Sequence, residues 1–303
     1  MRWFKTIFFT FLVIAAGNAS FTSESMGQTA RTAQLPAVTN MMLFSKRVYI
    51  TPRRLEAAAR SYGIKDFSVK VLKKYKDTYL VYVEKVPFIV INVSQSVPLR
   101  TFDDVLKFGF GLDNGKYIVS KQRAHVVISP FLKPENMTQS IPGAIGVVQV
   151  SGIISKLQKP LGHYWSHSDT LFSHAQFKNS EQAIQKAITL KSKNQSDAGA
   201  SLPFMMWVGL RLTGNMDGGK IGARTIGLEA FTGYELEVLP LQSKPQILGR
   251  QVYSAIEFIF KNGPVLKSGE ALWLGNSEYF RLSWKNATSS VPSRFLLTLL
   301  KGR

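Results

Sequence analysis

Segments of strand length, rich in β-branched and aromatic residues, recur along the whole chain between turn residues and capped helices. This mixture restricts the fold more than any other feature, because irregularly alternating helices and hairpins pack as an α+β domain. We predict strands at 41–50, 67–72, 79–84, 88–93, 124–129, 164–165, 204–212, 220–226, 235–239, 271–274 and 279–284. The predicted fold class is α+β, with mixed, mainly antiparallel sheets and packed helices. The β-α-β-β-α-β order at the start is also compatible with ferredoxin-like lobes, two in the whole chain.

Start and stop signals place helices between these strands. We predict helices at 52–62, from Thr101, within Pro134–Leu157, from Asn179 and from Ser243 to Asn262. The signals are the Thr51-Pro52 start, the Gly63 stop, capping boxes at Asn179/Gln182 and Ser243/Gln246, and the Asn262-Gly263-Pro264 stop. Pro142 is expected to delay or kink the third helix. Residues 215–219 carry a hairpin turn signal.

The N-terminus reads as an export signal. Arg2 and Lys5 form a short positive region, and an uncharged apolar run from Ile7 to Gly17 follows. Small residues then favour cleavage between Ala19 and Ser20, and the absence of cysteine excludes a lipid anchor at a lipobox. A retained anchor is the alternative, although the apolar run is shorter than the roughly 20 residues of a membrane span. We expect an exported protein, periplasmic or secreted, with no membrane span in the mature chain.

The rest of the chain divides into three parts. Residues 20–38 are rich in Ser, Thr, Ala and Gln and predict a disordered leader. Residues 41–285 predict a single α+β domain, with lobes at about 41–130 and 131–285. Residues 286–303 predict a basic C-terminal tail.

The chain is strongly basic, with a net charge of +19. Cleavage would remove two positive charges and leave +17, which favours an anionic envelope component or another protein as partner. The preferred explanation of the charge is a generally basic proteome, in which it only keeps the protein soluble. The positive residues are spread widely, whereas a nucleic-acid surface concentrates them, so nucleic acid is not an expected partner. With no cysteine, disulfides and thiolate metal sites are excluded.

The segment 162–169, Gly-His-Tyr-Trp-Ser-His-Ser-Asp, is the leading candidate for a binding site. We take Tyr164, Trp165, His167, His174 and Trp207 as ligand-binding candidates, with the two tryptophans forming an aromatic platform where both are partly exposed. His163 and His167 would chelate zinc on a helix, but on a strand they lie about 13 Å apart. We therefore predict no metal site, and no glycine motif predicts a cofactor.

A hydrolase is the alternative for the same segment, the Tyr164–His174 loop. Its nucleophile would be Ser129, Ser166 or Ser168, its base His125, His167 or His174, and Asp169 would orient the base. However, no G-x-S-x-G elbow or S-x-x-K motif surrounds these serines. Glu235 and Glu237 are interpreted as solvated charges on one strand face.

Five segments in order resemble the bacterial domain-of-unknown-function family 4261. They are residues 123–129 (RAHVVIS), 162–165 (GHYW), 202–208 (LPFMMWV), 225–228 (TIGL) and 262–269 (NGPVLKSG). The resemblance covers roughly residues 41–285 and implies a shared α+β fold, with no activity attached to it. We expect an exported, non-enzymatic binding or interaction protein. A hydrolase and a polyanion-binding envelope protein are the alternatives.

Overall fold

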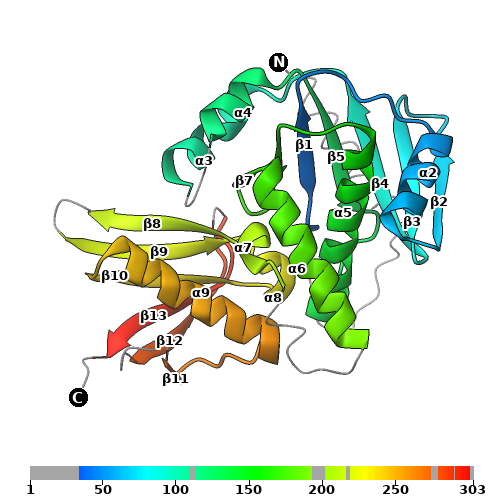
Figure 1. Cartoon of the computed structure of the whole chain (residues 1–303). Helices are drawn as coiled ribbons and strands as arrows, with labels where there is room; N and C mark the ends of the chain where they lie inside the picture. The colour runs from blue at the N-terminus through cyan, green and yellow to red at the C-terminus, as the bar shows by residue number, and fades with distance from the viewer. Residues whose placement is uncertain are drawn as a thin grey trace, which may run out of the picture. The chain divides into compact units, whose positions relative to one another are not determined.

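Two sheets with helices packed on them form the α+β fold predicted from the sequence (Figure 1). The computed structural model describes residues 34–109, 114–192, 202–215, 219–273, 279–289 and 291–300. The predicted signal peptide, its cleavage site and residues 20–33 of the predicted leader lie outside these residues. The prediction of disorder is wrong for residues 34–38, because Leu35 and Val38 are buried in the core and the Leu35 amide donates to the Pro134 carbonyl. The described residues belong to one compact unit.

The first sheet is antiparallel throughout its described pairings and has the strand order β2-β3-β4-β5-β1-β6-β7. Its strands are β1 (Asn40–Phe44), β2 (Phe67–Val71), β3 (Thr78–Val83), β4 (Val86–Val93), β5 (Ala124–Pro130), β6 (Gly162–Trp165) and β7 (Thr170–Ser173). Three strands separate β1 from β2, whereas a ferredoxin-like lobe has one strand there. The expectation of ferredoxin-like lobes is therefore wrong.

Helices cover both faces of this sheet because alternate side chains of a strand point to opposite sides. Helices α2 (Pro52–Tyr62), α5 (Met137–Leu157) and α6 (His174–Ser192) pack on the face that carries Met42 and Val126. On the other face, η1 (Leu99–Phe102), α3 (Asp103–Phe108) and α4 (Gly115–Lys121) pack around Leu43 and Leu171.

The cap signals explain where several helices begin. Thr51 accepts a hydrogen bond from the Arg54 amide, Pro52 opens α2, and Gly63 ends the helix with a left-handed φ of 93°, as predicted. Helix α6 begins at His174 rather than at Asn179, because Ser173 and Gln176 form the capping box instead. Two further predicted caps, Thr101 and Ser243, are not used, since the residues before α3 and α9 are Phe102 and Lys244.

Helix α5 is long and apolar enough to cross a membrane by length and composition. The prediction that nothing after residue 20 approaches a membrane span did not anticipate this helix. However, 61% of its apolar window is buried inside the fold, as is usual for a helix in a protein core. Pro142 lies within the helix and does not delay its start at Met137.

The second sheet is mixed and has the order β11-β12-β13-β10-β9-β8. Its strands are β8 (Gly209–Asn215), β9 (Lys220–Ile226), β10 (Glu235–Gln242), β11 (Ala271–Trp273), β12 (Tyr279–Lys285) and β13 (Arg294–Leu300). Helix α9 (Pro245–Asn262) packs on one face of this sheet, and the short helices α7 (Phe204–Trp207) and α8 (Glu229–Thr232) lie at the junction with the first sheet (Figure 1). One hydrophobic cluster includes residues of both sheets, such as Val126 of β5 and Ala223 of β9.

Three boundaries differ from the sequence prediction. Residues 294–300, predicted as part of a basic tail, form strand β13, which pairs with β10 in parallel and with β12 in antiparallel fashion. Residues 204–207 form a helical turn before β8 instead of the start of a strand. Strand β7 extends the first sheet to residue 173, so the predicted lobe boundary near residue 130 is wrong. Part of the predicted turn at 215–219 lies outside the described residues.

Candidate functional site

The predicted binding segment forms the tight turn at 166–169 between β6 and β7. Asp169 closes this turn in the left-handed region, with φ of 48°. Among residues other than glycine, Asp and Asn tolerate this conformation best, because a short polar side chain can hydrogen-bond locally. The turn residue types therefore match the backbone that the β6–β7 connection needs.

Two glycines, one at the start of β8 and one directly after β9, let this turn approach very closely. A Cβ atom at Gly209, the first residue of β8, would lie 2.2 Å from the Ser168 carbonyl oxygen. A Cβ atom at Gly227 would lie 2.7 Å from the Ser168 Cβ, and Gly227 also has a left-handed φ of 92°. Glycine is thus required at both positions, and the turn is held directly against the second sheet.

His167 fixes the same turn through both ring nitrogens. Its Nδ1 accepts a hydrogen bond from the Thr39 amide at 3.3 Å, and its Nε2 lies 3.0 Å from the Trp207 carbonyl oxygen. These partners require the neutral tautomer protonated on Nε2. Burial lowers the pKa of His167 to about 4, so the ring is neutral at pH 7.

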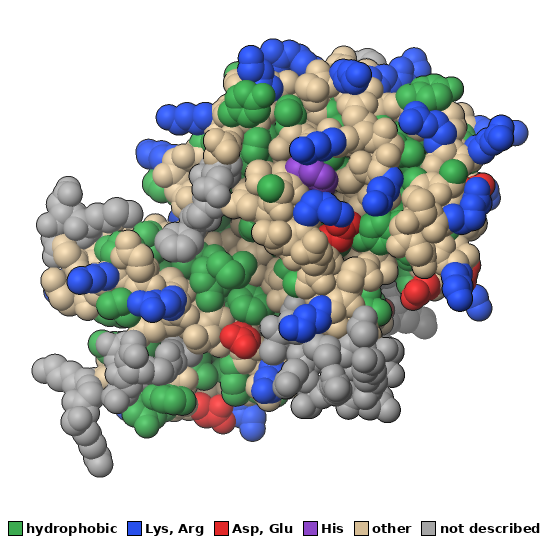
Figure 2. Space-filling view, in the orientation of Figure 1, with side chains coloured by type: hydrophobic (Ala, Val, Ile, Leu, Met, Phe, Trp, Pro, Cys, Tyr) green, Lys and Arg blue, Asp and Glu red, His purple; other side chains and the backbone are tan. Residues whose placement is uncertain are grey.

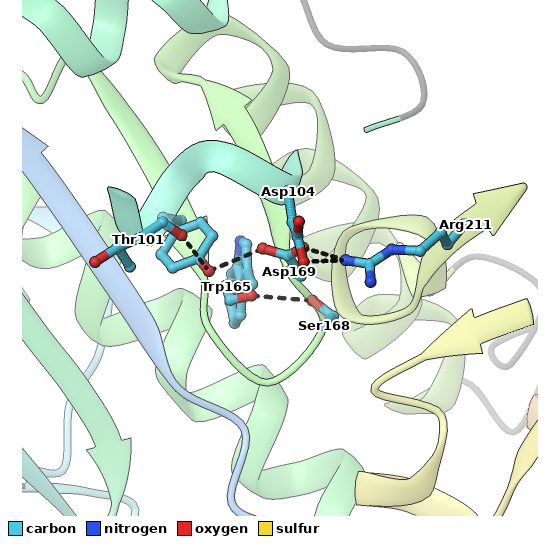
Figure 3. A network of polar contacts seen from close by, with 7 residues as sticks. Thr101, Asp104, Trp165, Ser168, Asp169 and Arg211 are labelled. Carbon is cyan, nitrogen blue, oxygen red and sulfur yellow. Dashed lines mark hydrogen bonds and ion pairs between the residues drawn. The ribbon is translucent and has the colours of Figure 1, made fainter. Parts of the chain in front are cut away.

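A chain of polar contacts links Tyr164, the turn and β8. The Tyr164 hydroxyl donates to Asp169 Oδ1 at 2.9 Å, and Asp169 Oδ2 accepts from Arg211 of β8 at 3.0 Å. The same Arg211 nitrogen also lies 3.1 Å from Asp104 Oδ2 of α3, and Figure 3 shows Arg211 reaching toward both carboxylates. Burial, and then the charge of Asp169, raises the pKa of Tyr164 well above its usual value, which keeps the hydroxyl a donor.

This network borders a shallow, partly open cleft with a cavity volume of about 30 Å³. The lining comes from α3 and the residue after it, the β6–β7 region, α7, β8, β9 and α9, and consists of Asp104, Val105, Phe108, Gly109, Ser168, Asp169, Thr170, Leu171, Phe172, Met205, Gly209, Leu210, Arg211, Ile226 and Tyr253. We call it the Arg211 cleft. Both Asp contacts use Nη2, so the Nε and Nη1 groups of Arg211 have no protein partner among the described residues.

Aromatic and polar groups share the walls of the Arg211 cleft. The Arg211 guanidinium lies 5.6 Å from the centre of the Phe108 ring, a cation–π distance. Tyr253 of α9 also lines the cleft, and burial raises the pKa of its hydroxyl to about 12. The cleft therefore offers hydrogen-bond donors, a half-exposed carboxylate at Asp104 and two aromatic rings.

The predicted ligand-binding residues do not converge on this cleft. Tyr164 borders the network, and His167 anchors the turn. Trp165 and Trp207 are both fully buried in the core, so the condition for an aromatic platform is not met. His174 lies at the start of α6, where its ring stacks near His163, with Nδ1 3.5 Å from His163 Nε2. Within the described ranges, no group of three His, Asp or Glu side chains could hold a metal.

The hydrolase alternative gains little support from these contacts. Ser168 donates to the Trp165 carbonyl oxygen at 3.3 Å and contacts Thr170 Oγ1 at 2.9 Å. Ser129 contacts Thr39, and Asp169 bonds to Tyr164 and Arg211 rather than to a histidine. The side chains of Ser129, Ser168 and Asp169 thus bond to other groups of the fold, and none of these bonds joins a serine or Asp169 to a histidine.

A second polar centre, which the sequence did not predict, surrounds Glu235 at the start of β10. Its carboxylate accepts hydrogen bonds from the Thr225 hydroxyl, the Gly227 amide at 2.7 Å and the Glu229 amide at 3.3 Å. The prediction of a solvated charge is wrong for Glu235, because the side chain is buried and fixes the turn into α8. Burial raises the pKa of this carboxyl to about 7 despite the three donors.

Sequence reasoning did not identify the other cleft residues, among them Asp104, Phe108, Arg211 and Tyr253. These residues come from three elements far apart in the chain, and none belongs to a motif. The one usable signal was the Tyr164–His174 loop, which reaches the cleft through Ser168, Asp169 and Thr170 rather than through its histidines.

The fold and this site define an α+β protein with a small polar cleft between two sheets. A family model described as a domain of unknown function (DUF4261) matches residues 224–299. The resemblance predicted from the sequence is confirmed over this stretch, which covers most of the second sheet and the Glu235 centre. Comparisons with curated proteins and with solved structures found no match.

Proposed function

We propose that the chain is an exported, non-enzymatic binding protein and that the rim of the Arg211 cleft contacts one edge of a neutral, polyhydroxylated ligand of the saccharide type. The arrangement of Arg211 carries this proposal. Two carboxylates hold its Nη2 in place, while Nε and Nη1 have no partner among the residues that the structure describes and lie at the edge of an aromatic-lined cleft. The donors are positioned before a ligand arrives, which reduces the entropy cost of binding.

Charge decides between a neutral and an anionic ligand. Asp104 and Asp169 balance the charge of Arg211 in the cleft wall together with that of Lys107, whose ammonium lies 4.9 Å from the centre of the Phe108 ring. An anion would therefore meet a site without net positive charge, although the chain as a whole is basic. Neighbouring hydroxyls of a sugar can accept from Arg211 and donate to Asp104, while the ring packs on Phe108 or Tyr253.

Binding of matched monosaccharides to the mature protein tests this proposal. Glucose and glucuronic acid differ mainly by one carboxylate, so calorimetric titration with each separates shape from charge. We expect saturable binding of glucose or another neutral hexose, and affinity for the acid lower by about threefold or more. The absence of saturable binding by every neutral hexose tried, or a preference for the acid, would overturn the proposal.

One pair of variants locates the binding. Asp103 and Asp104 are adjacent exposed acids at the start of α3, but only Asp104 lines the cleft. Asp104→Asn should weaken hexose binding about fivefold, whereas Asp103→Asn removes the same charge and should change it less than about twofold. Equal effects of the two variants would place the ligand elsewhere.

The basic surface supports a polyanion-binding role less directly. Figure 2 shows Lys and Arg side chains spread across the visible face rather than gathered in one stripe. Such a distribution is compatible with solubility alone.

A further inference from the structure

The second sheet has one face away from α9. Leu272, Phe280, Leu282 and Leu297 are buried in the core on the α9 side. Because side chains alternate along a strand, their neighbours point to the opposite side. We call that side the open face, and its members on β11, β12 and β13 include Trp273, Tyr279, Arg281, Lys285, Arg294 and Thr298.

Two aromatic residues lie next to each other on the open face. Trp273 of β11 is directly opposite Tyr279 of β12 in the strand register. Their side chains remain 62% and 49% exposed, although each carries a large apolar ring. Directly opposed residues have Cβ atoms about 5 Å apart, so the two side chains leave the open face from neighbouring positions.

Positive charge continues along the same strands. Arg281 follows Tyr279 by two residues and Lys285 follows Arg281 by four, so all three lie on the open face. Lys285 is directly opposite Arg294, an arrangement of like charges that disfavours the sheet slightly. Glu237 pairs with Arg294, but among the described residues no carboxylate forms an ion pair with Arg281 or Lys285.

We propose that the open face binds an anionic polysaccharide, independently of the Arg211 cleft. The sugar rings would pack on Trp273 and Tyr279, and the acidic groups would contact Arg281 and Lys285. An acidic polymer can pair with Arg281 and Lys285, which form no ion pair with a carboxylate of the described residues, and a neutral glycan cannot. A single adjacent ring pair at one end of a basic row fits one sugar unit plus flanking charges. Single-stranded nucleic acid would instead use rings repeated along its path.

Heparin binding by charge-matched variants tests this inference. Arg281→Ala with Lys285→Ala removes two charges from the open face, and Lys73→Ala with Lys74→Ala removes two from the β2–β3 connection. We expect the first pair to weaken heparin binding about tenfold and the second less than about threefold, at one fixed salt concentration. All four side chains are exposed, and melting temperatures should confirm that both variants fold.

Two further measurements complete the test. Trp273→Ala should weaken heparin binding without changing the slope of affinity against salt, because it removes ring contact and no charge. Equal losses from the two double variants would show that net charge alone attracts heparin and would overturn the proposal. Tighter binding of a single-stranded oligodeoxynucleotide than of heparin, lost in the same open-face variants, would assign the face to nucleic acid instead.

Discussion

At the scale of single residues, the structure depends on a few side chains whose surroundings the sequence does not reveal. Glu235 resembles any strand carboxylate in the sequence, yet it is buried and bonded to Thr225 and two backbone amides. Gly209 resembles an ordinary strand glycine, yet its missing Cβ admits the Ser168 carbonyl. Both roles depend on contacts between strands, which local composition cannot encode.

Replacement of Glu235 by Gln should change how stability depends on pH. The folded carboxyl has a pKa of about 7 against an ordinary value of 4.5, so the folded state binds more protons between these values. The contribution of Glu235 is therefore fully present below pH 4.5 and is lost as pH rises through 7, by up to about 3 kcal/mol. Urea unfolding of wild type and Glu235→Gln at pH 4.5 and 7 should show the wild type losing stability relative to the variant.

Between pH 4.5 and 7 the buried histidines change the stability in the opposite direction to Glu235. The pH dependence of the wild type alone would therefore not isolate the contribution of Glu235, and the comparison with the variant is necessary. Burial lowers the pKa of His125, His163, His167 and His174, so their contributions increase stability as pH rises. Because both proteins contain them, these contributions cancel in the difference. A difference that does not change with pH would contradict the role given to Glu235.

Replacement of Gly209 by Ala should destabilise the protein by about 1–3 kcal/mol, because the new methyl group would meet a backbone oxygen. Gly143→Ala is the matched control. Its Cβ would meet only the Pro130 side chain at 3.4 Å, within a helix where Ala is favoured over Gly. Chemical denaturation should show a loss only for Gly209→Ala, and a loss of similar size in both would contradict the close contact with Ser168.

At the scale of elements, local signals located most helices and strands, because caps and β-rich runs depend on neighbouring residues. Thr51, Pro52 and Gly63 set the ends of α2 as predicted. The sequence analysis did not predict strand β13, which lies between basic and polar residues. Its conformation depends on pairing with β10 and β12, and the residues next to it in the sequence do not indicate a strand. The cleft could not be predicted for the same reason, since Asp104 and Arg211 meet only through the tertiary fold.

Removal of β13 tests its place in the core. A chain that ends at Ser293 lacks Phe295 and Leu297, which are buried, and leaves β10 and β12 without a shared neighbour. We expect this truncation to lose cooperative unfolding and to aggregate, because two strand edges become exposed. A chain that ends at Leu300 should retain its circular dichroism spectrum and melting temperature. Normal folding of the chain that ends at Ser293 would show that residues 294–300 are a tail and not a strand of the core.

At the scale of the whole molecule, the proposed export predicts where the mature protein begins. Expression of the full chain with mass analysis of the exported fraction should give a protein that begins at Ser20. Ala19→Asp should block this cut, because a small residue is needed next to the cleaved bond, and leave the longer form in the membrane fraction. An intact Met1 on protein recovered from the cytosol would contradict the proposal.

The position of β13 in the sheet also affects when the chain can fold. Strand β10 is placed between β9 and β13, so the second sheet lacks an inner strand until residue 300 has been synthesised. Hydrophobic residues of both sheets share one core, which therefore cannot close on a partial chain. Under the proposed export, this delay would keep the emerging chain unfolded during its passage across the membrane, and folding would follow transport.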